Sequence, residues 1–338
     1  MGLFSFTQEL AMDLGTANTI IISGGKIVVD EPSVVALDRN GKTVAIGTKA
    51  QQMQGKTHAK IETIRPLRDG VIADFNAAEQ MIRGMIKMIN NKSRFFTPSL
   101  RMVVCIPSGS TEVELRAVRD SAEHAGGRDV YMIYEPMAAA IGIGLDVEAP
   151  DGNMIVDIGG GTTEIAIISL GGIVSNKSIR IAGDDLTQDI QEYMGRQHNM
   201  RIGERTAERI KVNVGSALVH LDIPPEDYKV YGPNRMTALP MEVPVSYTEI
   251  AHCLDKSISK IEMAVLNALE STPPELYADI VRNGIYLAGG GALLKGLDKR
   301  LQDKINIPFH IAEDPLHAVA KGTGIALKNI HKYNFLLR

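Results

Sequence analysis

Residues 155–164 read IVDIGGGTTE, and this stretch decides how the rest of the chain is interpreted. Two apolar residues precede Asp157, three glycines and two threonines follow it, and Ile165 to Leu170 form a β-type run. The pattern predicts a strand, a tight turn and a second strand. Glycines have no Cβ, so their backbone N–H groups are free to approach an anion. An acid at the end of the first strand is well placed to hold a divalent cation, directly or through its waters.

A second stretch, MDLGTANT at residues 12–19, repeats this pattern. In both places an Asp-x-Gly start is followed by a β run, a Gly-Gly turn and another β run. A match at such a long spacing indicates two similar halves and not a short-repeat solenoid. One glycine loop alone could be a simple hairpin with a solvated acid. Two such loops, carrying Asp13 and Asp157, could hold one polyphosphate from both sides.

The composition bounds the class of protein. A length of 338 residues suggests about two domains. Hydrophobic content of 44% and charged content of 22% are ordinary for a globular protein with a sizeable core. The net charge of −4 gives no electrostatic reason to expect a nucleic-acid partner. Cys105 and Cys253 are far apart in the sequence, and we expect buried, reduced thiols in a reducing cytosol. No stretch has the apolar length of a membrane span, and no signal peptide is expected.

Two apolar stretches are candidates for contact with a membrane surface. Leu3, Phe4 and Phe6 precede the first predicted strand, and Phe95 and Phe96 lie in a loop with basic neighbours. Aromatic and leucine side chains partition into the headgroup boundary, and basic residues favour anionic lipid. Alternatively, the first group simply begins the strand, and the second is tucked under the preceding helix.

Apolar periodicity and breaking residues give a coarse outline of the chain. Residues 31–74 are expected to form a small, strand-like insertion with little helix, and residues 221–245 to form loop and strand. Asp184 suits a helix N-cap, with a position facing a ligand as the alternative. Gly322 and Gly324 suggest close helix packing. Helices are predicted at about 76–91, 111–125, 184–197, 206–218, 247–271 and 316–332.

Three further features could belong to the same site as the glycine loops. Glu135 lies at a predicted strand-to-helix junction, where a carboxylate can face a cleft; a capping or solvated acid is the alternative. Glu208 and Lys211 are one helical turn apart, which alone is most often a solvated ion pair. Residues 285–293, IYLAGGGAL, form a third strand–glycine loop–helix pattern that can approach a nucleotide closely.

In this order, the motifs resemble the superfamily of actin, sugar kinases and heat-shock chaperone ATPases, and within it the MreB family of bacterial actins. The resemblance covers nearly the whole chain. Asn213 departs from the expected Glu, and residues 185–187 also differ, which concerns fine nucleotide contacts. The matching phrases are DLGTANT at 13–19, RDGVIAD at 68–74, EPMAAAIG at 135–142, DIGGGTTE at 157–164 and ERIK at 208–211.

The resemblance implies an α/β, actin-like ATPase fold. It consists of two duplicated ribonuclease H-like domains, each with a small inserted subdomain, and a nucleotide cleft between them. Domain I is expected to comprise residues 1–145, with its insertion at about 31–74, together with the C-terminal helix at about 316–338. Domain II is expected to comprise residues 146–315, with its insertion at about 184–245.

The resemblance also implies a role for each motif. Glu135 would position the water that attacks the γ-phosphate of ATP, while Asp13 and Asp157 would orient Mg²⁺ and complete the catalytic set. The remaining nucleotide contacts would come from the three glycine loops and two helices. They are Gly15, Thr16, Ala17, Asn18, Gly159, Gly160, Gly161, Thr162, Gly183, Asp184, Glu208, Arg209, Ile210, Lys211, Gly289, Gly290, Gly291, Ala292 and Leu293.

The function implied is that of an ATP-binding, slowly ATP-hydrolysing cytoskeletal protein, with GTP as an alternative nucleotide. It would assemble with itself into filaments at the inner face of the cytoplasmic membrane. There it would help determine rod cell shape with cell-shape and wall-synthesis membrane proteins. Hydrolysis in such proteins serves as a timer for assembly.

Two other functions share this fold. A small-molecule kinase needs a substrate pocket with its own general base, and no acid outside the quoted motifs suggests one. The insertions also look short for a large acceptor site. A chaperone-type ATPase is expected to add a peptide-binding domain after the ATPase core, and the ATPase pattern here extends to about Arg338.

Overall fold

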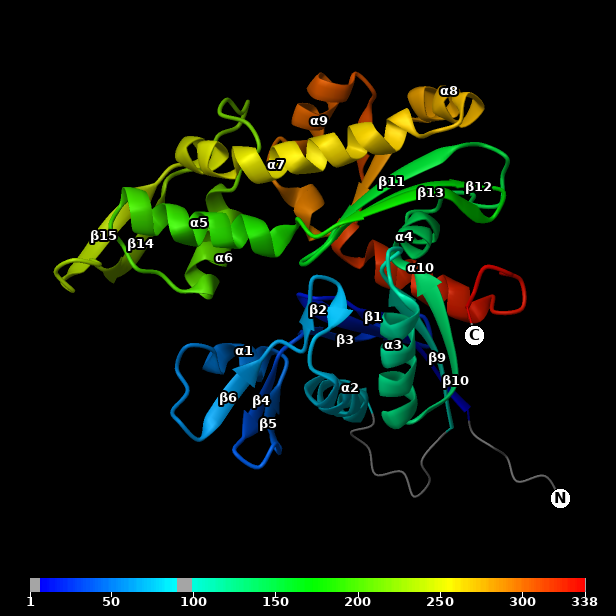
Figure 1. Cartoon of the computed structure of the whole chain (residues 1–338), viewed down its shortest axis with the longest axis horizontal. Coiled ribbons are helices and arrows are strands. Elements are labelled where there is room, and N and C mark those ends of the chain that lie inside the picture. The colour runs from blue at the N-terminus through cyan, green and yellow to red at the C-terminus, as the bar shows by residue number, and fades with distance from the viewer. Residues whose placement is uncertain (1–6, 90–98, 338) are drawn as a thin grey trace.

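Two five-stranded sheets with the same strand order form the frame of the protein (Figure 1). The computed structural model describes residues 7–89 and 99–337. In each sheet, three consecutive antiparallel strands are followed by two strands that pair in parallel. The first sheet consists of β3 (Lys26–Pro32), β2 (Asn18–Ser23), β1 (Thr7–Leu14), β9 (Ser99–Ile106) and β10 (Gly127–Tyr134). The second consists of β13 (Gly172–Ile179), β12 (Thr163–Ser169), β11 (Asn153–Ile158), β16 (Ile285–Ala288) and β17 (Phe309–Ile311).

The duplication expected from Asp13 and Asp157 is therefore present in the topology. Each acid lies near the carboxyl end of the strand at the centre of its sheet, β1 or β11. Parallel strands end on the same side of a sheet, so both glycine loops lie at the edge where ligands bind in open α/β sheets.

Helices cover the outer faces of both sheets, and two helices lie between them (Figure 1). Leu10, Met12 and Leu14 face α2 and α3, whereas Ala11 faces the central layer, because successive strand residues alternate in direction. The outer helices of the first half are α2 (Phe75–Ile89) and α3 (Glu112–His124). Those of the second half are α5 (Gly183–Gln197), α6 (Glu204–Val214), α7 (Tyr247–Glu270), α8 (Pro274–Asn283) and α9 (Leu297–Ile305).

The central layer contains α4 (Glu135–Gly142) and α10 (Ala318–Lys328), which share one hydrophobic cluster with strands of both sheets. The two helices cross at glycines. A Cβ on Gly142 would lie 1.8 Å from the carbonyl oxygen of Ala318, and one on Gly322 would lie 1.7 Å from that of Ala138. The close packing expected from the small residues is therefore confirmed at Gly322, whereas a Cβ on Gly324 would only come within 3.3 Å of Ile22.

Small elements extend from the two sheets. One three-stranded sheet, two short hairpins, the helix α1 (Thr48–Met53) and the 3-10 turns η1 (Gly290–Leu293) and η2 (Pro315–His317) complete the described fold. The short strands are β4 (Val35–Asp38), β5 (Thr43–Ile46), β6 (Ile61–Ile64), β7 (Leu67–Arg68), β8 (Val71–Ile72), β14 (Tyr228–Pro233) and β15 (Pro240–Val245). Within residues 7–89 and 99–337, no helix is both long and apolar enough to cross a membrane.

Most helix predictions agree with the structure, and three details were wrong. Asp184 is not an N-cap: Ala182 occupies that position, and its N–H donates to the Asp185 carboxylate at 2.9 Å. The helix predicted to reach residue 218 ends at Val214, because Gly215 is extended. The third glycine loop opens a 3-10 turn, η1.

The proposed domain boundaries stay a prediction. Leu3, Phe4, Phe6, Phe95 and Phe96 lie outside the described residues.

Candidate functional site

A cavity of about 710 Å³ lies where the carboxyl ends of the central strands of both sheets meet. Residues from both halves line it, including most of those that the sequence predicted. The predicted residues in its lining are Asp13, Gly15, Thr16, Ala17, Asn18, Glu135, Asp157, Gly159, Gly160, Gly161, Thr162, Gly183, Asp184, Glu208, Arg209, Lys211, Gly289, Gly290, Gly291 and Leu293.

Ile210 and Ala292 are the two predicted residues that do not line the cavity. Both side chains are fully buried in the hydrophobic core of the second half. Ile210 lies on the face of α6 opposite the cavity-lining residues, since that helix is amphipathic. The motif pattern identified the right segments, and helix geometry decides which of their side chains face the cavity.

The two glycine loops are in direct contact. A Cβ on Gly160 would lie 2.7 Å from the Cβ of Ala17, and one on Gly161 would lie 2.8 Å from Thr16 Oγ1. Contacts this short leave room only for glycine. The loops that the sequence placed on opposite sides of a cleft therefore meet at one end of the cavity.

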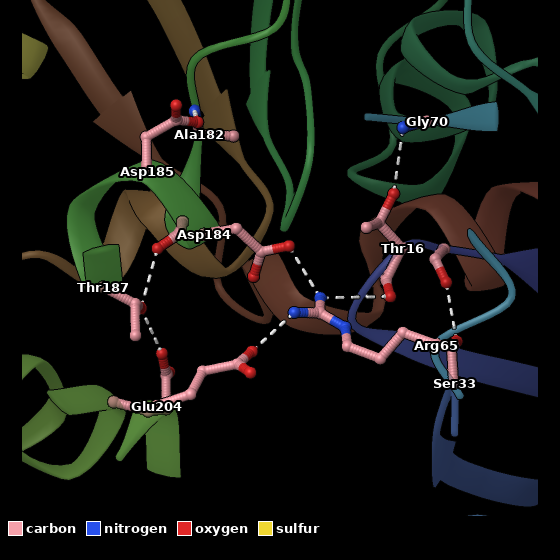
Figure 2. Close-up of polar contacts among 12 residues, drawn as sticks. Thr16, Ser33, Arg65, Gly70, Ala182, Asp184, Asp185, Thr187 and Glu204 are labelled. Atoms are coloured by element: carbon pink, nitrogen blue, oxygen red, sulfur yellow. Dashed lines mark hydrogen bonds and ion pairs between the residues drawn. The ribbon is translucent and has the colours of Figure 1, made fainter. Parts of the chain in front are cut away.

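The first loop is held by residues that follow it closely in the chain. Ser33 is fully buried, its hydroxyl donates to the carbonyl of Gly15 at 2.6 Å, and its N–H donates to the carbonyl of Ala17 at 2.9 Å. The N–H of Gly70 donates to Thr16 Oγ1 at 3.0 Å. Figure 2 shows this contact, with Thr16 between Gly70 and the Arg65 side chain.

The second loop is held by the start of α5. The N–H of Gly183 donates to the carbonyl of Gly159 at 3.1 Å, and the N–H of Asp184 donates to that of Gly160 at 2.8 Å. A Cβ on Gly289 would lie 2.4 Å from Asp157 Oδ1, so the third glycine loop also comes close to this acid. Gly289 has φ of +78°, a conformation that glycine adopts at no steric cost.

The carboxylates of Asp13, Glu135 and Asp157 lie close together in the lining of the cavity, and we call this part of the lining its floor. Asp157 is buried, whereas Asp13 and Glu135 are partly exposed to the cavity. Desolvation raises the pKa of Asp13 to about 6 and that of Asp157 to about 7, and the two charges also oppose one another. Desolvation, with the nearby Glu164, Asp157 and Asp13, raises the pKa of Glu135 well above its usual value. The floor therefore carries closely spaced acids that resist simultaneous ionisation.

Magnesium fits this set of donors. Among the described residues, no group of three or more His, Cys, Asp and Glu side chains forms a complete metal site. Mg²⁺ usually keeps several waters and takes one or two protein carboxylates together with phosphate oxygens. Asp13 and Asp157 supply two such carboxylates, and neither forms an ion pair within the part of the chain that the structure describes. A cation near them would favour the ionised forms of both acids, which burial disfavours.

Lys211 connects two helices at the rim of the cavity. Its Nζ donates to the carbonyl of Gly183 at 2.7 Å and pairs with Glu208 at the same distance. The Lys211 side chain is 16% exposed and that of Glu208 is 48% exposed, so the ion pair considered from sequence is present and is solvated on the Glu208 side only. Lys211 fastens α6 to the first residue of α5, next to the second glycine loop.

Sequence reasoning missed several residues that shape the site. Glu164 is fully buried and accepts from the N–H and hydroxyl of Ser108, in the other half of the molecule. Cys105 is buried, as expected, but its thiol also donates to Asp13 Oδ1 at 3.1 Å. Arg65 and Glu204 line the cavity and pair with one another at 2.7 Å. A lone Arg before a proline, or a Cys within a strand, carries no local signal of such long-range contacts.

Comparisons with known proteins agree with this geometry. A sequence model of the family described as MreB/Mbl protein matches residues 7–335. The chain belongs to the MreB/Mbl family. It is 46% identical over 329 residues to the cell shape-determining protein Mbl of Bacillus subtilis, covering 97% of this chain and 98% of the relative. It is 48% identical over 331 residues to the cell shape-determining protein MreB of Escherichia coli, covering 96% of this chain and 94% of the relative.

A solved structure shows the same fold. MreB 5 of Spiroplasma citri bound to AMPPNP superposes with a TM-score of 0.90 at 39% identity, covering 96% of this chain and 97% of that one. The structure of MreB5 from the same organism bound to ADP is similarly close, with a TM-score of 0.89. The predicted family and the predicted actin-like α/β fold are confirmed. The comparisons give no support to a small-molecule kinase.

Proposed function

We propose that this MreB/Mbl family member binds ATP with Mg²⁺ in the cavity, hydrolyses it slowly and polymerises into filaments. These filaments would lie at the inner face of the cytoplasmic membrane and organise wall-synthesis proteins in a rod-shaped cell. The observation that carries the proposal is the contact between the two glycine loops above a floor of three carboxylates. The names of the Bacillus and Escherichia relatives and the nucleotides bound to MreB5 support it.

The loops would hold the polyphosphate through backbone donors. Glycines 159–161 and residues 15–18 line the cavity, where N–H groups can approach phosphate oxygens without obstruction by side chains. Phosphoryl transfer depends on positioning and charge neutralisation more than on covalent catalysis. Mg²⁺, when bound by Asp13 and Asp157 through its waters, would supply positive charge for the phosphate oxygens.

Glu135 would orient the attacking water. It begins α4 directly after β10, so its backbone is held by a strand on one side and by Pro136 in the first helical turn on the other. Its ionised form accepts hydrogen bonds and could align a water toward the γ-phosphate. Glu208 and Arg209 on one side and Gly291 and Leu293 on the other line the part of the cavity that would take the ribose and the base.

Polymerisation tests the proposed function most directly. Purified protein with Mg-ATP should scatter light and pellet above a critical concentration. Protein without nucleotide, and protein with EDTA, are the controls. A chain that stays monomeric at all concentrations and phosphorylates a small alcohol would contradict the filament proposal and favour a kinase.

The membrane contact would involve two segments that leave the first sheet together. Thr7 and Ser99 are partners in the parallel pairing of β1 with β9. Residues 1–6 and 90–98, which contain Leu3, Phe4, Phe6, Phe95 and Phe96, are therefore joined to the same end of that sheet. One membrane surface could then receive aromatic side chains from both segments, with basic residues near anionic lipid.

Liposome co-sedimentation tests this contact. The double substitution Phe95→Ser and Phe96→Ser should reduce binding to anionic liposomes while ATP binding is kept, and deletion of residues 2–6 should do the same. Substitution of the exposed Val113 on α3 by Ser is the control and should change nothing. Unchanged liposome binding in both the double variant and the deletion would exclude these segments as the anchor.

A further inference from the structure

Arg65 lies in the lining of the cavity and joins the two halves of the molecule through its ion pairs (Figure 2). It lies between β6 and β7 in the first half of the molecule. Its Nη2 pairs with Asp184 Oδ2 at 2.6 Å, and its Nη1 pairs with Glu204 Oε1 at 2.7 Å. The same Nη2 lies 3.4 Å from the carbonyl oxygen of Thr16 in the first glycine loop. One guanidinium therefore contacts a phosphate-binding loop and two helices of the other half.

The two acids that pair with Arg65 lie at the starts of two helices that line the cavity. Asp184 lies in the first turn of α5 and Glu204 in the first turn of α6, the two helices that bound the cavity in the second half. Among the residues that the structure describes, no other ion pair joins residues 7–74 to residues 183–214. Arg65 is thus the single described charge connection on this side of the cavity.

The contacts form a closed ring around the glycine loops. The N–H of Asp184 holds the carbonyl of Gly160, and Gly160 packs against Ala17. Thr16 precedes Ala17 in the chain, and its carbonyl accepts from Arg65, which closes the ring. Release of Arg65 opens the ring at the one link made by side chains alone.

We propose that Arg65 is a latch that must release Asp184 and Glu204 before a bound nucleotide leaves the cavity. This inference rests on the proposed nucleotide function and adds to it the residue that sets the rate of nucleotide exchange. An arginine suits the task because its planar guanidinium presents several donors at fixed angles, whereas a lysine offers one compact charge. Its side chain is 20% exposed and those of the two acids are 38% and 54% exposed. Such pairs hold weakly enough to open repeatedly.

The rate of nucleotide dissociation tests whether Arg65 acts as a latch. The full chain is loaded with Mg²⁺ and the fluorescent analogue N-methylanthraniloyl-ATP, then chased with excess ATP. Arg65→Ala should release the analogue about tenfold faster, the change that about 1.4 kcal/mol produces. The double variant Asp184→Asn, Glu204→Gln should show the same acceleration, and adding Arg65→Ala to it should accelerate release no further.

Controls separate the latch from other roles of Arg65. Arg83→Ala removes an arginine that pairs with Glu79 at 2.8 Å on α2, and it should keep the wild-type rate. Arg65→Lys should release the analogue at a rate between those of the wild type and Arg65→Ala.

If Arg65→Ala does not fold, the release rate of the double acid variant alone decides whether the latch exists. A wild-type rate in Arg65→Ala overturns the latch, and a wild-type rate in the acid variant overturns it in favour of direct phosphate contact. A wild-type protein that binds no analogue overturns the proposed function and the latch with it.

Discussion

Both halves of the molecule place an acid followed by proline between the last strand of the sheet and a central helix, yet the two acids have opposite surroundings. Glu135 faces the cavity, and desolvation together with neighbouring acids raises its pKa well above the usual value. Asp314 accepts from Lys321 at 2.7 Å and from His317 at 2.8 Å, which lowers its pKa. A duplicated frame can thus leave one acid facing the cavity without a cationic partner among the described residues and pair the other with His317 and Lys321.

The two glycine loops differ in a similar way. The first loop is held by a buried serine and by Gly70, which belong to the segment between the first sheet and α2. The second is held by backbone N–H groups at the start of α5. The strands are duplicated, whereas the anchors of their loops are not.

The largest expected effect concerns the two acids. Glu135→Ala should slow phosphate release by about 10²-fold or more while ATP affinity is nearly kept, because only the orientation of water is lost. Asp314→Ala should leave both quantities close to wild type and reduce thermal stability instead. Phosphate release and ATP binding are measured for both variants. An equal loss of ATP affinity in Glu135→Ala would mean that Glu135 holds structure.

The contact between the loops should be the next most sensitive feature. Gly161→Ala places a Cβ 2.8 Å from Thr16 Oγ1 and 2.9 Å from the Asp69 nitrogen, which forces the loops apart. We expect ATP affinity to fall by about tenfold or more, equivalent to about 1.4 kcal/mol. Gly203→Ala is the matched control, since a Cβ there meets nothing within 4 Å. Equal ATP affinity in the two variants, measured by titration, would contradict the observed contact.

Asp13 and Asp157, at the ends of β1 and β11, should lower the free energy of unfolding at high pH by different amounts. Burial raises the pKa of Asp157 to about 7, with the Asp13 and Glu164 charges adding to the effect. Burial raises the pKa of Asp13 to about 6, where the Cys105 thiol and His317 partly oppose desolvation. A raised carboxyl pKa means that stability is present below the unfolded pKa and is lost as pH rises through the folded pKa.

Asp157→Asn should therefore stabilise the nucleotide-free protein at pH 8 by on the order of 1–2 kcal/mol. Asp13→Asn should stabilise it less, and neither should matter near pH 4. Melting temperatures at the two pH values provide the measurement. The reverse ranking of the two variants would contradict the larger cost of ionising Asp157 in the folded protein.

The smallest effect tests the anchors of the loops. Ser33→Ala removes the hydroxyl that donates to the carbonyl of Gly15 and should weaken ATP binding by about 1 kcal/mol. Thr163→Val is its counterpart in the second half, where the hydroxyl donates at 2.7 Å to Ile181, outside the loop. It should lower stability with ATP affinity unchanged. If both variants bind ATP equally, the loops do not differ in their dependence on side-chain anchors.

Local patterns were sufficient to predict the frame. The repeated Asp-x-Gly motif identified two halves, and apolar periodicity located helices such as α2 and α7 to within two residues at each end. The cavity-lining residues that lie in or beside a glycine loop were identified by their proximity to the motif in the sequence. The direction of each side chain was harder to predict from the sequence, since Ile210 shares a helix with Lys211 but faces the core. Arg65 could not be predicted, because its partners are 119 and 139 positions away.

The crossing of α4 and α10 has a mechanical consequence. At Gly142 and Gly322 the backbone of one helix lies directly against the backbone of the other, because neither residue has a side chain. Because α10 packs on strands of the first sheet and α4 also packs on strands of the second, this backbone contact sets how closely the two sheets approach one another. An alanine at either position would clash with the carbonyl of the facing helix and force the two helices apart.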